Sequence, residues 1–321
     1  MEKSSRIFVA GHRGLVGSAI VRLLESRGYR EPLKATSAEL DLTDQQQVAR
    51  WFEEKKPEYV FLAAAKVGGI AANDTFPAEF IRQNLAIELN VIHESWKHGV
   101  ERLVFLGSSC IYPRDCPQPI REEYFLTGPL EKTNQAYALA KIAGVEMCAS
   151  YNRQYGTKFV CSMPTNLYGI GDNYDLQKSH VLPALIRKAH EAKASSAKSM
   201  VVWGSGRARR ELMLSDDLAE ACLLLMTAQW DEVKRAMPNE RLPLLNAGTG
   251  VDISIAELAR LVCEIVGYKG ELSWDSTRPD GTPQKVLEVS RMNSLGWRSR
   301  TALAEGIRMA YADFTLSLGR G

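Results

Sequence analysis

The chain has 321 residues, enough for a large core and for one main domain with a smaller second one. Its 40 lysines and arginines nearly balance its 38 aspartates and glutamates, so the formal net charge is +2. No global field marks nucleic acid or an anionic membrane as the partner, and recognition of an anion has to be local.

The first half of the chain alternates short apolar runs with helical patterns. The β-rich run RIFVA at 6–10 leads into GHRGLVG and then into a segment with helical spacing. Further strands are predicted at 59–65, 102–108 and 158–163, and helices over 76–97 and 137–155. Continuous apolar strands separated by helices are typical of a parallel sheet covered on both faces. The sequence therefore predicts an α/β fold with a Rossmann-type, doubly wound parallel sheet.

This alternation loosens beyond about residue 166. The polar, glycine-rich segment 168–179 has the composition of a loop above a site. We predict that residues 1–166 form a dinucleotide-binding domain to which segments of 215–250 return. Residues 167–321 are then expected to form mainly a smaller C-terminal α/β domain for the substrate.

The cysteines and the apolar runs indicate the setting of the protein. The six cysteines form neither a CxxC pair nor a cysteine-histidine cluster at metal-ligand spacing, so no metal site is predicted. The start, MEKSSRIFVAGHRG, lacks the apolar stretch of a secretory signal, and no apolar run approaches a membrane span. We expect a cytoplasmic protein that binds neither nucleic acid nor membrane.

A glycine turn follows the first predicted strand. Gly11, Gly14 and Gly17 form GxxGxxG between this strand and a helix. Glycines here permit a tight turn, close approach of a pyrophosphate to the backbone and close packing of helix on strand. The alternative is a turn that is merely tight, but the strand-turn-helix context favours dinucleotide binding.

The region after the second expected strand bears on the choice of cofactor. An NAD enzyme usually has an acidic residue there, but LKATSAELDLTD has no carboxylate before Glu39. Lys34 and Arg13 could face a 2′-phosphate, although Lys34 would equally suit a solvated surface. NADP(H) is therefore favoured. Asp41 and Leu42 would suit the adenine edge and face.

The motif YALAK contains a candidate proton donor. Tyr137 and Lys141 are four residues apart, so both side chains project from one face of a helix. An ammonium close to a phenol stabilises the phenolate, which lets a tyrosine exchange its proton near neutral pH. Ser108, at the end of a predicted strand, would bind a carbonyl oxygen while a nicotinamide carries the hydride. Together with the glycine turn, this set indicates a reductase.

Several segments carry a resemblance over nearly the whole chain: GHRGLVG, AAAKVGGI, FLGSSCIYP, YALAK, MPTNLYG, SHVLPALIRK, WGSG with its following RRE, and RPDGTPQK. They resemble the extended short-chain dehydrogenase/reductase family, and within it the enzymes that convert GDP-4-keto-6-deoxy-D-mannose to GDP-L-fucose. The resemblance implies that one site epimerises carbons 3 and 5 of the hexose and then reduces the 4-ketone with NADPH. GSSCIYP with SHVLPA is the most selective pair of motifs.

The implied epimerisation needs two acid/base groups besides the tyrosine. Protons on the carbons beside a ketone are acidic, and inversion removes a proton from one face and returns one to the other. By resemblance Cys110 is the base and His180 the acid, and both have suitable chemistry. The alternatives are a buried packing thiol for Cys110 and a cap or anchor of the following helix for His180.

The resemblance also implies binding residues. Those for the cofactor are Gly11, His12, Arg13, Gly14, Leu15, Val16, Gly17, Ser37, Asp41, Leu42, Leu106, Gly107, Ser109, Lys141, Pro164, Asn166, Leu167 and His180. Those for the nucleotide sugar are Lys188, Trp203, Arg210, Asp280 and Lys285. Arginine suits a bidentate phosphate contact and lysine a point charge, although Lys188 could be an ordinary exposed helix residue.

Other functions remain open at this point. The enzyme could perform only one of the two steps, or act on a 3,6-dideoxy ketosugar as in GDP-colitose synthesis. A non-catalytic nucleotide-binding module could share the fold, but the full set Ser108, Tyr137 and Lys141 argues against it. The resemblance further suggests a homodimer formed by two long helices, those beginning near Phe76 and Tyr137.

Overall fold

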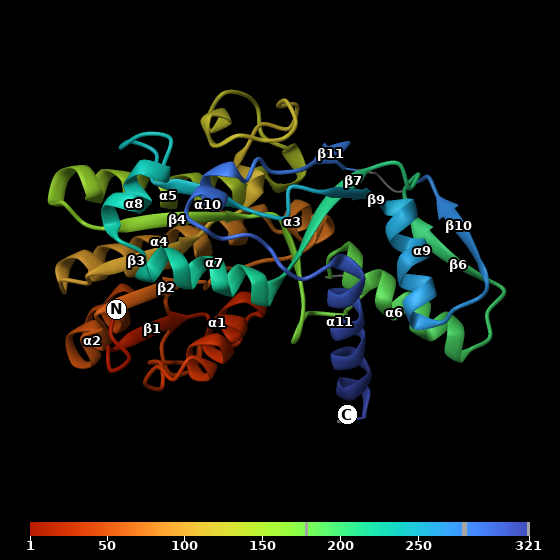
Figure 1. Ribbon diagram of the computed structural model, residues 1–321, viewed down its shortest axis with the longest axis horizontal. Helices are drawn as coiled ribbons and strands as arrows, with labels where there is room; N and C mark the ends of the chain where they lie inside the picture. The colour runs from red at the N-terminus through yellow and green to blue at the C-terminus, as the bar shows by residue number, and fades with distance from the viewer. Residues whose placement is uncertain (177–178, 278–280, 320–321) are drawn as a thin grey trace.

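Two lobes of unequal size make up the molecule in the computed structural model, which describes residues 1–176, 179–277 and 281–319 (Figure 1). The larger lobe contains the N-terminus and a sheet with helices on both faces. The smaller lobe contains the C-terminal helix α11 (Leu303–Leu318), and the C-terminus lies at its far end.

The sheet of the larger lobe has five parallel strands in the order β1-β2-β3-β4-β8. Its strands are β1 (Ile7–Ala10), β2 (Tyr59–Leu62), β3 (Arg102–Leu106), β4 (Phe159–Pro164) and β8 (Leu244–Ala247). All five are buried along their length, which explains why they read as continuous apolar runs. A further strand was expected between the first two helices, before the segment that bears on the choice of cofactor. The structure has only a single bridge there, between Leu33 and Phe8.

Helices cover both faces of this sheet. Those of the larger lobe are α1 (Leu15–Ser26), α2 (Gln45–Lys55), α3 (Ile70–Thr75), α4 (Pro77–Lys97), α5 (Gln135–Tyr155), α7 (Ser215–Thr227), α8 (Trp230–Ala236) and α10 (Ser290–Ser294). Ile7 and Val9 belong to the apolar cluster of α1 and α7, whereas Phe8 and Ala10 belong to that of α2, α4 and α5. This alternation along one strand gives the sheet two separate cores.

Short helical turns connect the strand ends to the site. They are η1 (Ser109–Ile111), η2 (Glu122–Tyr124) and η3 (Lys132–Asn134). The predicted strand 102–108 ends at Leu106, because the chain leaves the sheet there and turns into η1. Ser108 is thereby placed just beyond the carboxyl end of β3, and η1 contacts α5.

The smaller lobe has its own core. Its strands are β5 (Asn166–Tyr168), β6 (Ser199–Trp203), β7 (Arg209–Leu214), β9 (Asp252–Ser254), β10 (Glu271–Asp275) and β11 (Gln284–Lys285), and its helices besides α11 are α6 (Val181–Ala194) and α9 (Ile255–Val266). β7 pairs in parallel with β5 and β11 and antiparallel with β9, and β6 pairs in parallel with β10. Tyr168, Leu258 and Ile307 are among the buried residues that join these helices and strands.

The chain crosses between the lobes more than once. After β7, helix α7 packs against α1, and β8 joins the edge of the larger sheet beside β4. Figure 1 shows β7 reaching from the smaller lobe toward the larger one. The α/β fold with a parallel, Rossmann-like sheet is confirmed.

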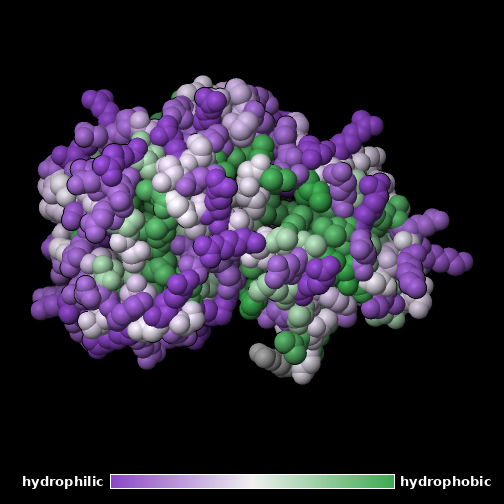
Figure 2. Space-filling view, viewed as in Figure 1, coloured by the Kyte–Doolittle hydropathy of each residue, from purple (hydrophilic) through white to green (hydrophobic). Residues whose placement is uncertain are grey.

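The visible surface is mostly hydrophilic. Figure 2 shows that its apolar residues gather mainly on the smaller lobe, beside the junction with the larger one. None of the helices in the described ranges combines the length and the apolarity that crossing a bilayer requires.

Candidate active site

The glycine turn between β1 and α1 is closely packed on its inner side. Gly11 has φ +85°, and a Cβ there would lie 2.7 Å from the backbone of Ala64. A Cβ on Gly17 would lie 2.1 Å from the carbonyl oxygen of Gly11, so α1 can approach the strand only with glycine at this position. The space beside Gly14 is open, since a Cβ there would meet only the carbonyl oxygen of Gly11, at 3.4 Å. The turn is a cradle in which backbone can approach a pyrophosphate.

The basic residues predicted for a 2′-phosphate lie near this turn. Arg13 and Lys34 both act on His12, whose pKa is lowered mainly by burial and then by these two charges. Lys34, however, forms ion pairs with Glu31 at 3.0 Å and Glu25 at 3.7 Å. Its charge is already compensated, and Arg13 is the better placed of the two for an added phosphate.

The segment between the Leu33 bridge and α2 holds the residues predicted for the adenosine. Asp41 Oδ1 accepts hydrogen bonds from the backbone and the hydroxyl of Thr43, at 2.9 and 2.8 Å. The carbonyl of Leu42 accepts from Asn90 Nδ2 of α4 at 2.9 Å. Ser37 of the same segment is exposed. The contact with Asn90 holds this segment against α4, while Ser37 remains at the surface.

Ser108, Cys110 and Tyr137 form one cluster where β3 meets α5. The backbone N–H of Cys110 donates to Ser108 Oγ at 3.4 Å. Burial raises the pKa of Tyr137 well above its usual value, with Cys110 and Glu88 raising it further and a hydrogen bond with Ser108 lowering it. The sequence-predicted serine, cysteine and tyrosine therefore influence one another directly.

Lys141 is buried beneath this cluster and pairs with an unexpected partner. Its Nζ lies 3.0 Å from the carbonyl oxygen of Leu106 and 3.1 Å from Oε1 of Glu88. The ammonium was expected to lower the pKa of Tyr137, but that pKa is raised. The expectation is wrong for this structure because burial disfavours the phenolate most, and the nearby Cys110 and Glu88 disfavour it further. No signal in the sequence had singled out Glu88.

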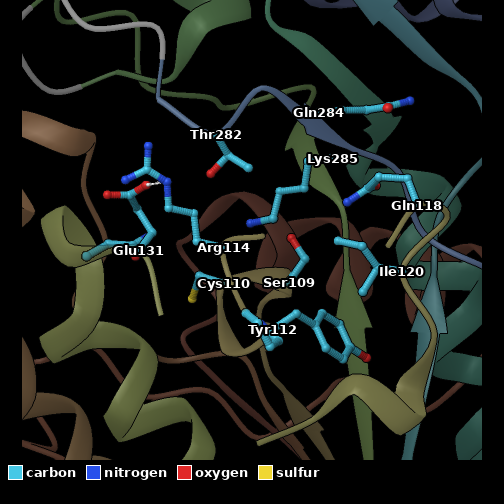
Figure 3. Close-up of a pocket in the computed structure, with 12 residues that line it drawn as sticks. Ser109, Cys110, Tyr112, Arg114, Gln118, Ile120, Glu131, Thr282, Gln284 and Lys285 are labelled. Atoms are coloured by element: carbon cyan, nitrogen blue, oxygen red, sulfur yellow. Dashed lines mark ion pairs between the residues drawn. The ribbon is translucent and has the colours of Figure 1, made fainter. Parts of the chain in front are cut away.

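Cys110 lines a cavity of about 30 Å³ that is shared with Lys285. Figure 3 shows the Lys285 side chain extending toward the turn with Ser109 and Cys110. Burial raises the pKa of Cys110, whereas the charge of Lys285 is the largest influence that lowers it. The cavity has room for about one water molecule. The thiol is therefore both a buried residue and part of the wall of this cavity.

Arg114 and Glu131, which no sequence pattern indicated, complete the wall of this cavity. Arg114 and Glu131 form an ion pair, Nε to Oε2, at 3.4 Å, drawn as a dashed line in Figure 3. Burial lowers the pKa of Lys285, while Cys110, Cys116 and Glu131 raise it. Arg114 follows η1 and Glu131 caps η3, and neither belongs to a motif, so only their convergence in space identifies them.

The smaller lobe brings Arg210 and Lys285 side by side. β11 pairs with β7 so that Lys285 lies opposite Arg210 in the register. Next to Arg210, the buried carboxylate of Glu211 accepts hydrogen bonds from the N–H groups of Gly250 and Leu287, both at 2.7 Å. Glu211 thus ties the two adjoining segments to β7 and fixes the two basic residues in place. Glu211 belongs to the RRE motif, but no role was predicted for it from the sequence.

Lys188 and Trp203 also come together in the smaller lobe. Lys188 Nζ lies 4.6 Å from the centre of the Trp203 ring, within the range of a cation–π contact, and 3.1 Å from the carbonyl oxygen of Val201. Trp203 is 43% exposed, so part of its ring lies at the surface. Asp280, the remaining residue predicted for the substrate, lies outside the described residues.

His180 ends the loop that precedes α6. It occupies the N-cap position without a side-chain capping hydrogen bond, so the cap that the sequence allowed as an alternative is absent. The imidazole keeps an exposed surface, and burial of its remainder lowers its pKa. A neutral imidazole at a loop end can exchange a proton near neutral pH.

The other predicted cofactor residues lie along the carboxyl edge of the sheet, where open α/β folds bind ligands. Leu106 and Pro164 end β3 and β4. Asn166 Nδ2 donates to the carbonyl oxygen of Glu211 at 2.9 Å, and Leu167 follows in β5. Gly107 leaves room for the side chain of Met163. No group of three or more potential metal ligands occurs in the described part of the chain.

Comparisons with known proteins agree with this arrangement. Residues 7–237 match the model of the NAD dependent epimerase/dehydratase family. The chain is 52% identical to GDP-L-fucose synthase 1 of Arabidopsis thaliana, covering 97% of this chain and 93% of that protein. It is 50% identical to GDP-L-fucose synthase of Escherichia coli (strain K12), covering 96% of each.

A solved structure extends the likeness to three dimensions. The GDP-D-glycero-L-gluco-heptose synthase of Campylobacter jejuni, in the presence of NADPH, superposes with a TM-score of 0.92 at 40% identity, covering 98% of this chain and 99% of that one. The likeness extends over both lobes, because it covers nearly the whole of each chain. This chain therefore belongs to the NAD dependent epimerase/dehydratase family.

Proposed function

We infer that the protein is an NADP-dependent oxidoreductase and epimerase that converts GDP-4-keto-6-deoxy-D-mannose to GDP-L-fucose. Carbons 3 and 5 are inverted first, and the 4-ketone is then reduced in the same site. The observation that carries this function is the single cluster of Ser108, Cys110 and Tyr137, because it joins an oxygen-binding pair to a thiol beside one pocket. Relatives that share half of this sequence over nearly their full length carry the name of this activity.

The glycine turn fits the cofactor. Gly11 and Gly17 leave no space for a side chain on the inner side, and Gly14 leaves the outer side open for a pyrophosphate. The cofactor is NADP(H), with Arg13 as the residue for the 2′-phosphate. When bound, NADPH supplies the hydride for carbon 4.

In the reductive step, Ser108 holds the carbonyl oxygen of the sugar and Tyr137 gives it a proton. Tyr137 can act as the acid because its raised pKa keeps the phenol protonated over a wide pH range. Lys141 lies buried below the tyrosine, held by the carbonyl oxygen of Leu106, and belongs to the cofactor site.

In the epimerisation steps, Cys110 removes the proton beside the ketone and His180 returns one from the other face. Burial disfavours the thiolate of Cys110, and the charge of Lys285 offsets part of this cost. Lys285 therefore serves Cys110 as well as the substrate. His180 enters from the smaller lobe and requires the two lobes to meet around the sugar.

The GDP portion is held by the smaller lobe. Arg210 and Lys285 lie opposite each other on paired strands and provide the positive charge for the diphosphate. Lys188 and Trp203 form a cation–π pair in the same lobe that can take a flat or anionic part of the nucleotide. We keep Asp280 as a predicted contact. In domain terms, residues 1–166 with parts of 215–250 bind the cofactor, and 167–321 mainly bind the substrate.

Replacement of Cys110 by serine tests the bifunctional reading against a single-step enzyme. With GDP-4-keto-6-deoxy-D-mannose in deuterated buffer, the Cys110→Ser variant should lose exchange of deuterium into the sugar and keep its affinity for NADPH. Cys116→Ser is the matched control, since Cys116 also lies near Lys285 yet has no assigned role. Unchanged exchange in Cys110→Ser would remove Cys110 from the mechanism, whereas a parent enzyme without any exchange would be a reductase alone.

We also propose that the protein is a homodimer. Large hydrophobic side chains on the two longest neighbouring helices are exposed in the single chain, among them Leu85 and Leu89 of α4 and Leu139 of α5. Burying them between two copies would remove this apolar surface from water. A Leu89→Asp variant should sediment as a monomer where the parent sediments as a dimer.

The cytoplasm is the location that we propose. All six cysteines are free thiols in the structure, which fits a reducing compartment. Fractionation of cells that express the tagged protein tests this location.

A further inference from the structure

One buried charged group near the reaction cluster has no role in the steps described above. Glu88 lies in the middle of α4, and its carboxylate is 1% exposed. Its Oε1 lies 3.1 Å from Nζ of Lys141, but neither of its oxygens meets hydrogen-bond geometry with any described residue. A buried carboxylate held mainly by one ammonium is costly, so its retention at this place calls for a reason.

The surrounding structure makes room for this carboxylate. A Cβ on Gly144 of α5 would lie 2.9 Å from Glu88 Oε2 and 2.5 Å from the Phe105 ring, so glycine opens the space that the carboxylate occupies. The titratable groups that face Glu88 are Lys141 and Tyr137 from α5 and Cys161 from β4. The carboxylate thus faces the two residues of the YxxxK pair from below.

We propose that Glu88 is a positioning residue of the reductive step, which holds the Lys141 ammonium below Tyr137 and compensates its charge so that Tyr137 stays protonated until it donates to the sugar. This role rests on the proposed function. The positive charge of Lys141 alone would pull the phenol toward its ionised form, whereas the pair of Lys141 and Glu88 is neutral and leaves the phenol a proton donor.

The protonation of Glu88 itself supports this role. Burial raises the pKa of Glu88 to about 7, and Lys141 limits the rise. Above that pH the carboxylate is charged and raises the pKa of Tyr137. The wild-type enzyme should therefore keep an effective acid at alkaline pH, where an uncompensated ammonium would promote loss of the phenol proton.

The test compares the pH profile of ketone reduction in the wild type and in Glu88→Gln. The substitution keeps the shape and removes the negative charge, so the alkaline limb of kcat should move to lower pH by about one unit or more. Glu88→Asp should recover part of the shift. Glu94→Gln is the matched control, because Glu94 is a buried glutamate of the same helix that pairs with Lys97 and His98, and its profile should match the wild type.

Two further readouts separate this role from a general structural one. Deuterium exchange at carbons 3 and 5 should persist in Glu88→Gln, because it depends on Cys110 and His180. The ionisation of Tyr137 can also be followed by ultraviolet titration without any ligand. The difference between wild type and Tyr137→Phe gives the titration of this phenol in the wild type, and the difference between Glu88→Gln and Glu88→Gln/Tyr137→Phe gives it in the variant. The phenol should ionise at lower pH in the variant.

The outcomes are distinct. An alkaline limb and a phenol titration unchanged in Glu88→Gln would overturn the role of Glu88. A wild type that reduces no GDP-ketosugar would instead refute the proposed function, while the ligand-free titration would still report on Glu88. If Glu88→Gln fails to fold, Glu88→Met removes the same charge with a side chain of similar length, and wild-type values for its profile and titration would likewise overturn the proposal.

Discussion

The two lobes hold their site residues in different ways. In the larger lobe, Gly11 and Gly17 are fixed by backbone contacts, and Lys141 is enclosed between helices α4 and α5. In the smaller lobe, Lys188 and Trp203 meet at the surface, and the indole is 43% exposed. The residues proposed for the chemistry thus lie where a shift would disturb a core, whereas those proposed for the nucleotide lie nearer the surface.

Replacement of Tyr137 by phenylalanine should have the largest effect and would show how far the larger lobe alone controls the chemistry. Removing the general acid should lower kcat for ketone reduction by about 10³-fold. Consumption of NADPH with the GDP-ketosugar measures this change. Affinity for NADPH should stay within about twofold, because the phenol does not hold the diphosphate. Near-normal turnover would mean that another group supplies the proton.

Two glycine variants should separate packing from binding within the turn. Gly17→Ala places a Cβ 2.1 Å from the Gly11 oxygen, so it should lower the free energy of unfolding by about 1–3 kcal/mol and weaken NADPH binding. Gly14→Ala has a contact of 3.4 Å and should preserve stability while weakening NADPH binding. Denaturant unfolding and a fluorescence titration with NADPH measure the two effects. Equal stability losses in both variants would contradict the packing of the turn.

Substitutions in the smaller lobe should affect recognition more than chemistry. Arg210→Ala should raise KM for the GDP-ketosugar by about 10- to 100-fold with little change in kcat, because it removes a charged contact to the diphosphate. Lys188→Ala should have a smaller effect, since its ammonium remains partly solvated. Steady-state kinetics measure both. A loss confined to kcat would place Arg210 in the chemical step instead.

Lys34 should show the smallest effect. Because Lys34 already pairs with Glu31 and Glu25, Lys34→Ala should change the preference for NADPH over NADH by less than about threefold. Arg13→Ala is the comparison and should weaken that preference more. The ratio of Kd for the two cofactors is the measurement. A greater loss in Lys34→Ala would show that its ion pairs open when the cofactor binds.

Much of the fold and part of the site could be predicted from local patterns. Strands that are buried on both faces read as continuous apolar runs, and the turn of Gly11, Gly14 and Gly17 carries its own signature. Ser108, Cys110 and Tyr137 belong to short motifs, so they could be named without coordinates. The strand expected before the cofactor-selecting segment was wrong, because this part of the chain forms only a single bridge at Leu33 and local composition does not distinguish a bridge from a strand.

The sequence by itself determined which chemical groups the protein has and the periodicity that makes its parallel sheet, since both are local properties of the chain. Only the tertiary structure decided which charges neutralise each other. Lys141 meets Glu88 of another helix, and Lys285 meets Cys110 from the other lobe. Such pairs join residues that are distant along the chain, and the strength of their interaction depends on burial that only the packed molecule provides.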